Sequence, residues 1–258
     1  MKKFLITLMV MATVCLFAKE ITLALVCSSA CQSYNLTNPA YIHGWGEVLP
    51  EFLSSDVKVL NFAISGRSTK SFILFGDWDK VVAAKADYVI LALGANDTPA
   101  TKRYATTVEE FKNNLRKMAR ESMAAGSKVI FCTLNQSMKT VDNGSRVTFF
   151  KGEPLRKDRI VHCQAIREVA REFNVPCLEL FDNQYRYMKF LGESKCAGFY
   201  RVHHKKKNFG KLDGSHTNLR GARFVAAIIA EELTKSGTEL AEKVNSEKLK
   251  AAKEELFK

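Results

Sequence analysis

The segment that decides the fold reads ITLALVCSS, residues Ile21–Ser29. Its first seven residues, Ile21–Cys27, are apolar at every position except Thr22. Such near-continuous apolarity is typical of a strand whose two faces are both covered by helices. The two serines that follow mark the end of the strand. The segment therefore predicts the first strand of a parallel sheet, with polar side chains at its carboxyl end.

Four more segments share this apolar, β-branched character and are predicted as strands: Val57–Ala63, Tyr88–Leu93, Lys128–Leu134 and Val175–Leu180. Longer segments carry apolar residues at helical spacing and are predicted as helices: Val108–Ala125, Arg159–Phe173 and Asn218–Lys235. Strands that alternate with helices through right-handed crossovers build a parallel sheet between two helical layers. We therefore expect an α/β fold, a three-layer α/β/α sandwich around a five-stranded parallel sheet.

The length and composition suit one globular domain. With 258 residues, 47% of them hydrophobic, the chain is long enough to bury a substantial core. We expect this domain over residues 19–237, followed by a charged tail over residues 238–258. The tail is amphipathic over Ala241–Lys258, which predicts a peripheral helix.

The N-terminus is expected to lie outside this domain, as a signal peptide over residues 1–18. Lys2 and Lys3 precede an apolar run, Phe4–Phe17, and Ala18 supplies a small residue at its end. This pattern is typical of a secretory signal, whereas a membrane span needs about 20 apolar residues. We therefore expect export to the periplasm or the extracellular space, with no membrane insertion of the mature chain.

The chain is basic, with a formal net charge of +12 that falls to about +10 without Lys2 and Lys3. The positive residues are dispersed apart from one run, His203–Lys207, for which a solvated loop is a better interpretation than a binding patch. A basic surface would attract acidic polysaccharides such as pectins, through long-range forces that salt weakens. Charge would also suit nucleic acid, but export argues against it. We expect a monomer with no nucleic-acid partner.

The cysteines predict no metal site. Of the seven, Cys15 would leave with the signal, and the other six show no Cys-x-x-Cys pair or metal-ligand spacing. Export would permit disulfides. However, Cys27 and Cys132 lie in apolar runs, where buried free thiols are common. The pairing of the cysteines therefore stays open.

Polar residues gather after three of the predicted strands and ahead of the last helix. These four segments are Cys27–Ala30, Ser65–Ser68, Gly94–Asp97 and Asp213–Asn218. Functional groups of parallel sheets gather outside the carboxyl ends of the strands, so we expect the four turns to meet at one rim. Together they supply a serine, backbone N–H groups, an asparagine amide, and an aspartate and a histidine three residues apart.

Acyl transfer requires this set of groups. A serine hydroxyl becomes a nucleophile when a neutral imidazole takes its proton, and a carboxylate holds that imidazole in the right tautomer. The oxyanion that forms needs donors, which the N–H groups of Ser29 and Gly66 and the amide of Asn96 would supply. Each group also has a structural interpretation, as a turn residue, a positive-φ glycine, a helix cap or a loop pair. Their joint occurrence at four junctions favours catalysis.

Four longer motifs extend this pattern: HGWGEVLP at His43–Pro50, NFAISGRSTKSF at Asn61–Phe72, GDWD at Gly76–Asp79 and DGSHTN at Asp213–Asn218. With them, the chain resembles the SGNH (also called GDSL) hydrolases, and most closely their rhamnogalacturonan acetylesterase-like branch. The resemblance covers residues 21–233 and is weakest over residues 138–159 and 182–212.

By position, the resemblance makes Ser29 the nucleophile, His216 the base and Asp213 the acid that orients His216. Ser29, Gly66 and Asn96 become the donors of the oxyanion hole. The implied fold is the flavodoxin-like SGNH hydrolase fold. The implied reaction is hydrolysis of an acetyl ester on plant cell-wall polysaccharide, pectin (rhamnogalacturonan) or xylan, through an acetyl-serine intermediate. No metal or organic cofactor is implied.

The first block departs from the family's Gly-Asp-Ser, because this chain reads Cys27-Ser28-Ser29. A side chain in place of glycine would shift Ser29, and a displaced reacting group loses about 10²-fold in rate per ångström. This departure defines an alternative, a catalytically weak relative that binds carbohydrate, in which restoring Gly and Asp raises turnover. A lipid esterase or lysophospholipase on the same fold is a further alternative.

Aromatic residues near the rim are candidates for stacking on sugar rings: Tyr34, Trp45, Trp78 and Tyr200. For the two tryptophans, packing beneath the site is an equally good interpretation. Arg67 and His203 are candidates for contact with an acidic sugar.

Overall fold

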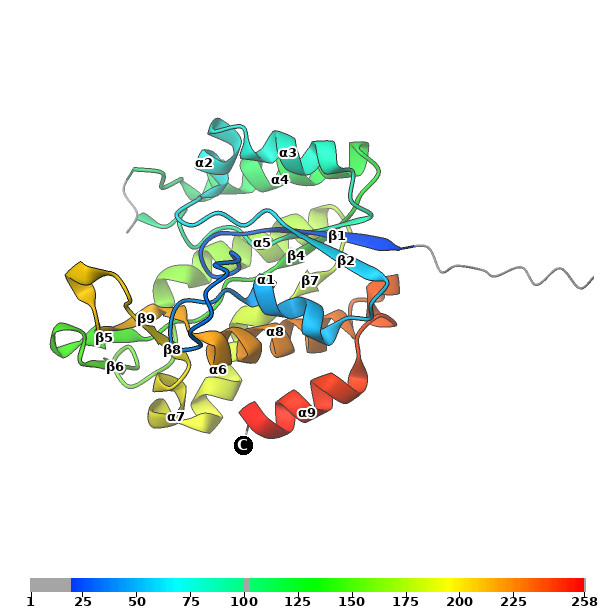
Figure 1. Cartoon of the computed structure of the whole chain (residues 1–258). Coiled ribbons are helices and arrows are strands. Elements are labelled where there is room, and N and C mark those ends of the chain that lie inside the picture. The colour runs from blue at the N-terminus through cyan, green and yellow to red at the C-terminus, as the bar shows by residue number, and fades with distance from the viewer. Residues whose placement is uncertain (1–19, 100–102, 258) are drawn as a thin grey trace, which may run out of the picture.

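A computed structural model describes residues 20–99 and 103–257, and a five-stranded parallel sheet lies at the centre of the fold (Figure 1). The strands are β1 (Ile21–Val26), β2 (Val57–Asn61), β3 (Tyr88–Leu91), β4 (Lys128–Cys132) and β7 (Cys177–Leu178). Their order across the sheet is β2-β1-β3-β4-β7, the flavodoxin-like arrangement. The α/β fold and all five predicted strands are confirmed.

Helices cover both faces of the sheet and form the predicted three layers (Figure 1). One layer contains α2 (Thr69–Leu74), α3 (Asp77–Ala84), α4 (Val108–Ala124) and α5 (Ile160–Glu172). The other contains α1 (Trp45–Val48), α6 (Leu180–Leu191), α7 (Glu193–Ala197), α8 (Leu219–Leu233) and α9 (Ser246–Leu256). The three long helices predicted from apolar spacing, α4, α5 and α8, are confirmed with ends that differ by two residues or fewer.

The two covered faces explain the unbroken apolarity of the strands. Leu23 and Leu25 are fully buried in the hydrophobic cluster that includes α8. Ala24 and Val26 point the other way, into the cluster that α4 and α5 complete. Burial of a leucine or valine side chain contributes about 1.5–3 kcal/mol, so each position of β1 adds to the stability of one layer or the other.

The register of the sheet places the carboxyl ends of β1, β2 and β3 side by side. Leu25 lies opposite Asn61 of β2, and Val26 lies opposite Leu91 of β3. The loops that follow these three strands therefore leave the sheet at one edge, as the site prediction requires.

Two antiparallel hairpins that the sequence did not predict lie beyond this edge (Figure 1). They pair β5 (Lys139–Val141) with β6 (Arg146–Thr148), and β8 (Tyr200–Val202) with β9 (Leu212–Thr217). The expectation of a turn at Asp213–Asn218 is therefore wrong, because Asp213–Thr217 form most of β9. Their polar side chains lack the apolar alternation by which a strand is identified in a sequence.

Gly214 joins the two hairpins. Its carbonyl accepts a hydrogen bond from Met138 N–H at 2.7 Å, and its own N–H donates to Thr140 Oγ1 at 2.9 Å. A Cβ at position 214 would lie 2.4 Å from Met138 O. Only glycine therefore permits this close approach of the β5–β6 hairpin to β9.

The two ends of the chain differ in what the structure describes. The predicted signal peptide, residues 1–18, lies outside the described residues. The predicted tail contains α9, whose Leu249, Ala252 and Leu256 are buried in the same hydrophobic cluster as the apolar face of α8. The tail therefore contributes to the packing of this layer.

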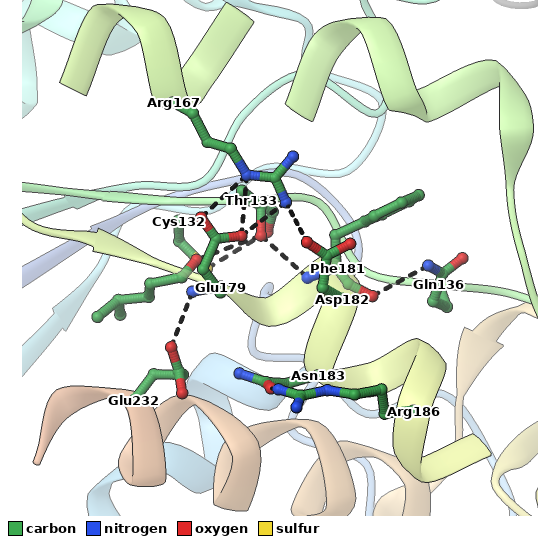
Figure 2. Close-up of polar contacts among 11 residues, drawn as sticks. Cys132, Thr133, Gln136, Arg167, Glu179, Phe181, Asp182, Asn183, Arg186 and Glu232 are labelled. Atoms are coloured by element: carbon green, nitrogen blue, oxygen red, sulfur yellow. Dashed lines mark hydrogen bonds and ion pairs between the residues drawn. The ribbon is translucent and has the colours of Figure 1, made fainter. Parts of the chain in front are cut away.

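A polar network secures the short edge strand β7 (Figure 2). Arg167 of α5 donates from Nε and Nη2 to Glu179 Oε2 at 3.0 and 2.7 Å, and Glu179 N–H donates to Glu232 of α8 at 3.1 Å. Phe181 N–H donates to Thr133 Oγ1 at 2.9 Å. Because β7 has only two residues, these bonds supplement its short ladder and hold α5, α6 and α8 around it.

Candidate active site

Ser29, His216 and Asp213 meet at the carboxyl edge of the sheet. Ser29 Oγ lies 3.0 Å from His216 Nε2, and His216 Nδ1 lies 2.8 Å from Asp213 Oδ2. Ser29 follows β1, whereas the other two residues lie on β9, and their side chains are 26% (His216) and 12% (Asp213) exposed. These contacts would allow His216 to take a proton from Ser29 while Asp213 holds the imidazole. The structure thus brings together the three residues predicted as nucleophile, base and orienting acid.

A shift in the β8–β9 register brings Asp213 and His216 to the same side. Residues three apart on a regular strand point to opposite faces, because side chains alternate with a period of two. Here Tyr200 pairs with Thr217, but the next residue, Arg201, pairs with Asp213. The chain between Asp213 and Thr217 therefore bulges, as strands often do beside active sites.

The turn after β1 presents Ser29 at the edge. Ser28 O accepts hydrogen bonds from the N–H groups of Cys31 and Gln32 at 3.1 and 3.2 Å, so the chain closes into a helical turn. The Tyr34 hydroxyl donates to Ser29 O at 3.0 Å. Burial raises the pKa of Tyr34 to about 12, so this donor keeps its proton at neutral pH. Backbone and side-chain bonds together fix the position of Ser29.

The HGWGEVLP segment ties the Ser29 turn to β9. Trp45 N–H donates to Ala30 O at 2.9 Å. His43 N–H donates to Thr217 O at 3.0 Å, and Thr217 Oγ1 donates to His43 O at 2.9 Å. The segment therefore connects the residue after Ser29 with the residue after His216, which gives this motif a structural role in the site.

Asp213 lies among donors that stabilise its charge. Burial raises its pKa, but hydrogen bonds from His216, from Ser215 N–H and from Arg201 outweigh burial and hold the pKa well below its ordinary value. Arg201 Nε lies 2.8 Å from Asp213 Oδ2. Asp213 is therefore ionised, as an orienting acid must be. Arg201 could not be predicted from the sequence, because its contact with Asp213 depends on the β8–β9 pairing.

Gly66 and Asn96 occupy the loops after β2 and β3. Gly66 has φ +81°, and a Cβ there would have nothing within 4 Å, so glycine is needed for its backbone angle and not for space. Asn96 Nδ2 donates to Arg67 O at 3.0 Å, which ties the two loops together. Ser65 N–H donates to Gln32 Oε1 at 2.5 Å, which joins both to the Ser29 turn. The oxyanion-hole role of Ser29, Gly66 and Asn96 stays a prediction.

Asp97 supports the loop that carries Asn96. It is fully buried and accepts hydrogen bonds from Thr69 N–H at 3.0 Å and from Thr106 Oγ1 at 3.2 Å. Thr69 is the first residue of α2, whose N-cap is Ser68, so Asp97 binds the N-terminus of this helix from the neighbouring loop. Burial raises the pKa of Asp97 to about 6, an effect that its bonds to Thr69 and Thr106 partly offset.

Asp97 is expected to make stability fall as the pH rises. Its carboxyl has a pKa of about 6 in the folded chain against an ordinary 3.8, so between these values the folded chain keeps a proton that the unfolded chain has lost. The free energy of unfolding, relative to that of Asp97→Asn, should fall by about 2.4 kcal/mol from about pH 4 to pH 7. Urea unfolding of both proteins across this range measures the difference. A difference that does not change with pH would contradict the raised pKa.

The aromatic candidates divide into buried and accessible residues. Trp45 and Trp78 are 2% and 1% exposed, so both pack in the core, and stacking on a sugar ring is excluded in this conformation. Tyr200 is also buried. Tyr34 is half-buried and is the one member of this set that reaches the surface beside Ser29.

The described residues hold free cysteines but no metal cluster and no membrane-spanning helix. Over residues 20–99 and 103–257, no three His, Cys, Asp or Glu side chains form a group suited to a metal ion. Six cysteines in these ranges are free thiols, including Cys27 and Cys31 beside the site. In the same part of the chain, no helix is both long and apolar enough to span a bilayer.

Two proteins of Bacillus subtilis (strain 168) are similar in sequence. The chain is 29% identical over 205 residues to the rhamnogalacturonan acetylesterase RhgT, a match that covers 76% of this chain and 83% of that protein. It is 24% identical over 209 residues to the probable rhamnogalacturonan acetylesterase YesY, with 80% and 89% covered.

Solved structures share the fold. The acetylxylan esterase Axe2 from Geobacillus stearothermophilus matches with a TM-score of 0.60 at 17% identity, over 88% of this chain and 98% of Axe2. The Bacillus subtilis protein YXIM matches with a TM-score of 0.69 at 24% identity, over 86% of this chain but only 58% of that chain. The chain thus spans little more than half of YXIM.

The model of the GDSL-like Lipase/Acylhydrolase family matches residues 29–224, a range that begins at Ser29 and includes Gly66, Asn96, Asp213 and His216. This range is most of the chain, and the sheet order and the site agree with it. The protein is a carboxylic ester hydrolase that belongs to the GDSL-like lipase/acylhydrolase family, the SGNH hydrolases.

Proposed function

We propose that this esterase is exported and removes acetyl groups from plant cell-wall polysaccharide, with Ser29 as its nucleophile. The observation that carries the proposal is the hydrogen-bonded series from Ser29 through His216 to Asp213, with distances of 3.0 and 2.8 Å. The similarity to two rhamnogalacturonan acetylesterases supports an acetylated polysaccharide as the substrate. The basic and apolar pattern of residues 1–18 supports export.

Acylation begins at the Ser29 hydroxyl. His216 Nε2 takes its proton as Oγ attacks the carbonyl carbon of the acetyl ester, and the ionised Asp213 stabilises the imidazolium that forms. The negative charge moves to the carbonyl oxygen, where the N–H groups of Ser29 and Gly66 and the amide of Asn96 would donate to it. Collapse of this intermediate breaks the bond to the sugar oxygen, which receives the proton from His216.

Deacylation repeats these steps with water. The acetyl group is now on Ser29 Oγ, and His216 takes a proton from a water molecule that attacks the acetyl carbon. The second tetrahedral intermediate releases acetate and returns the proton to Ser29. No step requires a metal ion or an organic cofactor.

The position of the basic run supports an acidic polysaccharide. His203–Lys207 connects β8 to β9, so it belongs to the same hairpin as Arg201 and Asp213. The side chains of Lys205, Lys206 and Lys207 are exposed. A uronate-containing chain that approaches Ser29 would pass near these charges, whose attraction salt would screen. Pectic material is therefore proposed ahead of neutral xylan.

Acetate release from purified protein tests this proposal. Acetylated rhamnogalacturonan, acetylated xylan and an aryl acetate are compared, with Ser29→Ala as the control. The expected result is Ser29-dependent acetate release, fastest from rhamnogalacturonan and more sensitive to salt there than with the aryl ester. Absence of acetate from all three substrates would contradict the proposal and favour a binding protein. Faster release of fatty acid from a lysophospholipid would favour a lipid esterase.

Replacement of Cys27 and Ser28 by the family's Gly and Asp is expected not to raise turnover. Cys27 has an ordinary negative φ, and its thiol donates to Ala92 O at 3.3 Å, so glycine offers no conformational gain there. Ser28 is 3% exposed, so aspartate would bury a carboxylate. We expect Cys27→Gly/Ser28→Asp to lower the free energy of unfolding by about 1–3 kcal/mol. Aryl acetate kinetics and urea unfolding measure both effects, and a higher kcat would identify Cys27-Ser28 as a catalytic defect.

A further inference from the structure

Arg201 contacts Asp213, the aspartate of the site, through two of its guanidinium nitrogens. It lies on β8 directly across from Asp213 on β9. Its Nε and Nη2 atoms are 2.8 and 2.7 Å from Asp213 Oδ2, and the two side chains are only 14% and 12% exposed. The same oxygen receives His216 Nδ1 at 2.8 Å, while Ser215 N–H donates to Oδ1 at 2.8 Å. Arg201 and His216 therefore share one carboxylate oxygen.

This sharing has an electrostatic consequence. The aspartate of such a site holds the histidine in place and also stabilises its protonated form. A guanidinium is charged at every accessible pH, and its planar fork binds a carboxylate in a defined orientation. Beside Asp213 it compensates part of the negative charge that His216 would otherwise experience. A proton on His216 is then held less strongly, so the neutral base persists to lower pH.

The other charged groups around Asp213 do not supply the permanent positive charge that Arg201 supplies. His203 Nε2 lies 3.8 Å from Asp213 Oδ2, but burial, followed by the charge of Arg201, lowers the pKa of His203, so it is neutral near pH 7. Within 4.0 Å of this carboxylate, in the part of the chain that the structure describes, Arg201 is the one permanent cation. Two further ionisable groups near Asp213 are Tyr34, after β1, and Tyr200, on β8. Asp142 and Lys211 line a cavity of about 480 Å³ that Asp213 also borders.

We propose that Arg201 is a positioning residue of this esterase: it holds Asp213 against His216 and compensates its charge, so that His216 acts as a base at lower pH than it would beside an unpaired aspartate. The inference rests on the proposed roles of Ser29, His216 and Asp213. Arg201 lies where the resemblance to the family is weakest, so the family pattern does not supply it.

The pH profile of kcat/KM with an aryl acetate tests this role, because a purely structural contact would not move it. Arg201→Gln is expected to shift the acidic limb upward by about one pH unit, a tenfold loss on that limb, with a smaller loss on the plateau. Arg201→Lys keeps a charge but loses the fork, so a smaller shift in the same direction is expected. Arg116→Gln is the matched control, since Arg116 binds Glu172 through Nε and Nη2 at 2.8 and 2.9 Å between α4 and α5.

Each outcome of these experiments either supports or overturns the proposed role of Arg201. An acidic limb of Arg201→Gln at the wild-type position, with only the plateau lowered, would overturn the proposal, as would an equal shift in Arg116→Gln. If Arg201→Gln does not fold, an unchanged profile of Arg201→Lys overturns it and a shifted one supports it. The absence of Ser29-dependent hydrolysis in the wild type would contradict the proposed function alone. The NMR titration of His216 in Ser29→Ala, with and without Arg201→Lys, then decides the role of Arg201, with a higher midpoint expected in the double variant.

Discussion

Ser29→Ala is expected to lower kcat for an aryl acetate by at least about 10⁴-fold. The reason is the geometry at Ser29 Oγ, which lies 3.0 Å from the only imidazole nitrogen in contact with it among the described residues. Without that oxygen no acetyl-serine forms, and His216 has no nucleophile to activate. Initial rates with excess enzyme, followed by absorbance, measure the loss.

The neighbouring serine provides a matched control. Ser28→Ala removes the same atom one residue earlier, where the side chain is 3% exposed and faces the interior. The backbone bonds from Cys31 and Gln32 to the carbonyl of residue 28 remain available in this variant. We expect Ser28→Ala to keep at least a tenth of the wild-type kcat. Retained activity in Ser29→Ala, or its loss only in Ser28→Ala, would assign the nucleophile to another residue.

Asn96→Ala is expected to lower kcat by about 10²–10³-fold while KM changes little. An amide that donates to the oxyanion acts mainly in the transition state, because the charge it stabilises is not yet present in the bound ester. The bond of Asn96 Nδ2 to Arg67 O at 3.0 Å and the neighbouring Asp97, which is fully buried, hold Asn96 in position. Steady-state kinetics of the folded variant measure kcat and KM separately.

The variant Asn96→Asp tests whether the Asn96 side chain donates a hydrogen bond to the oxyanion or only supports the local structure. Aspartate keeps the size of the side chain but replaces the amide N–H groups with an oxygen that repels the oxyanion. Its kcat should therefore be no higher than that of Asn96→Ala. A variant in which KM rises in proportion to the fall of kcat/KM, with kcat unchanged, would show that Asn96 binds the substrate and does not stabilise the oxyanion.

The central sheet is predictable from the sequence because burial on both faces leaves a simple pattern. In β1, Ala24 and Leu25 face opposite layers and both are fully buried, and Thr22 is the one polar residue of the strand. The β8–β9 hairpin is not predictable in this way. Tyr200–Val202 is too short to show a period, and the register shift between Tyr200 and Arg201 breaks the alternation along β9.

In the candidate site, too, some residues are predictable from the sequence and others are not. Ser29, Asp213 and His216 are identified by the residue types after the first strand and ahead of the last helix and by the resemblance to the family, and the structure brings them into contact. Arg201 was missed because nothing local marks it, and its contact with Asp213 exists only once two strands pair. For Trp45 and Trp78 the sequence left stacking on a sugar and packing open as equally good interpretations, and exposures of 2% and 1% decide for packing.

Labelling with a fluorophosphonate, followed by tandem mass spectrometry, tests the central claim most directly. The reagent phosphonylates a serine that a histidine activates, so it reports the Ser29–His216 pair without any assumption about the natural substrate. We expect one phosphonyl group per chain on Ser29, and none in Ser29→Ala or His216→Ala. An unlabelled but folded wild-type protein, or a label on a different residue, would contradict Ser29 as the activated nucleophile.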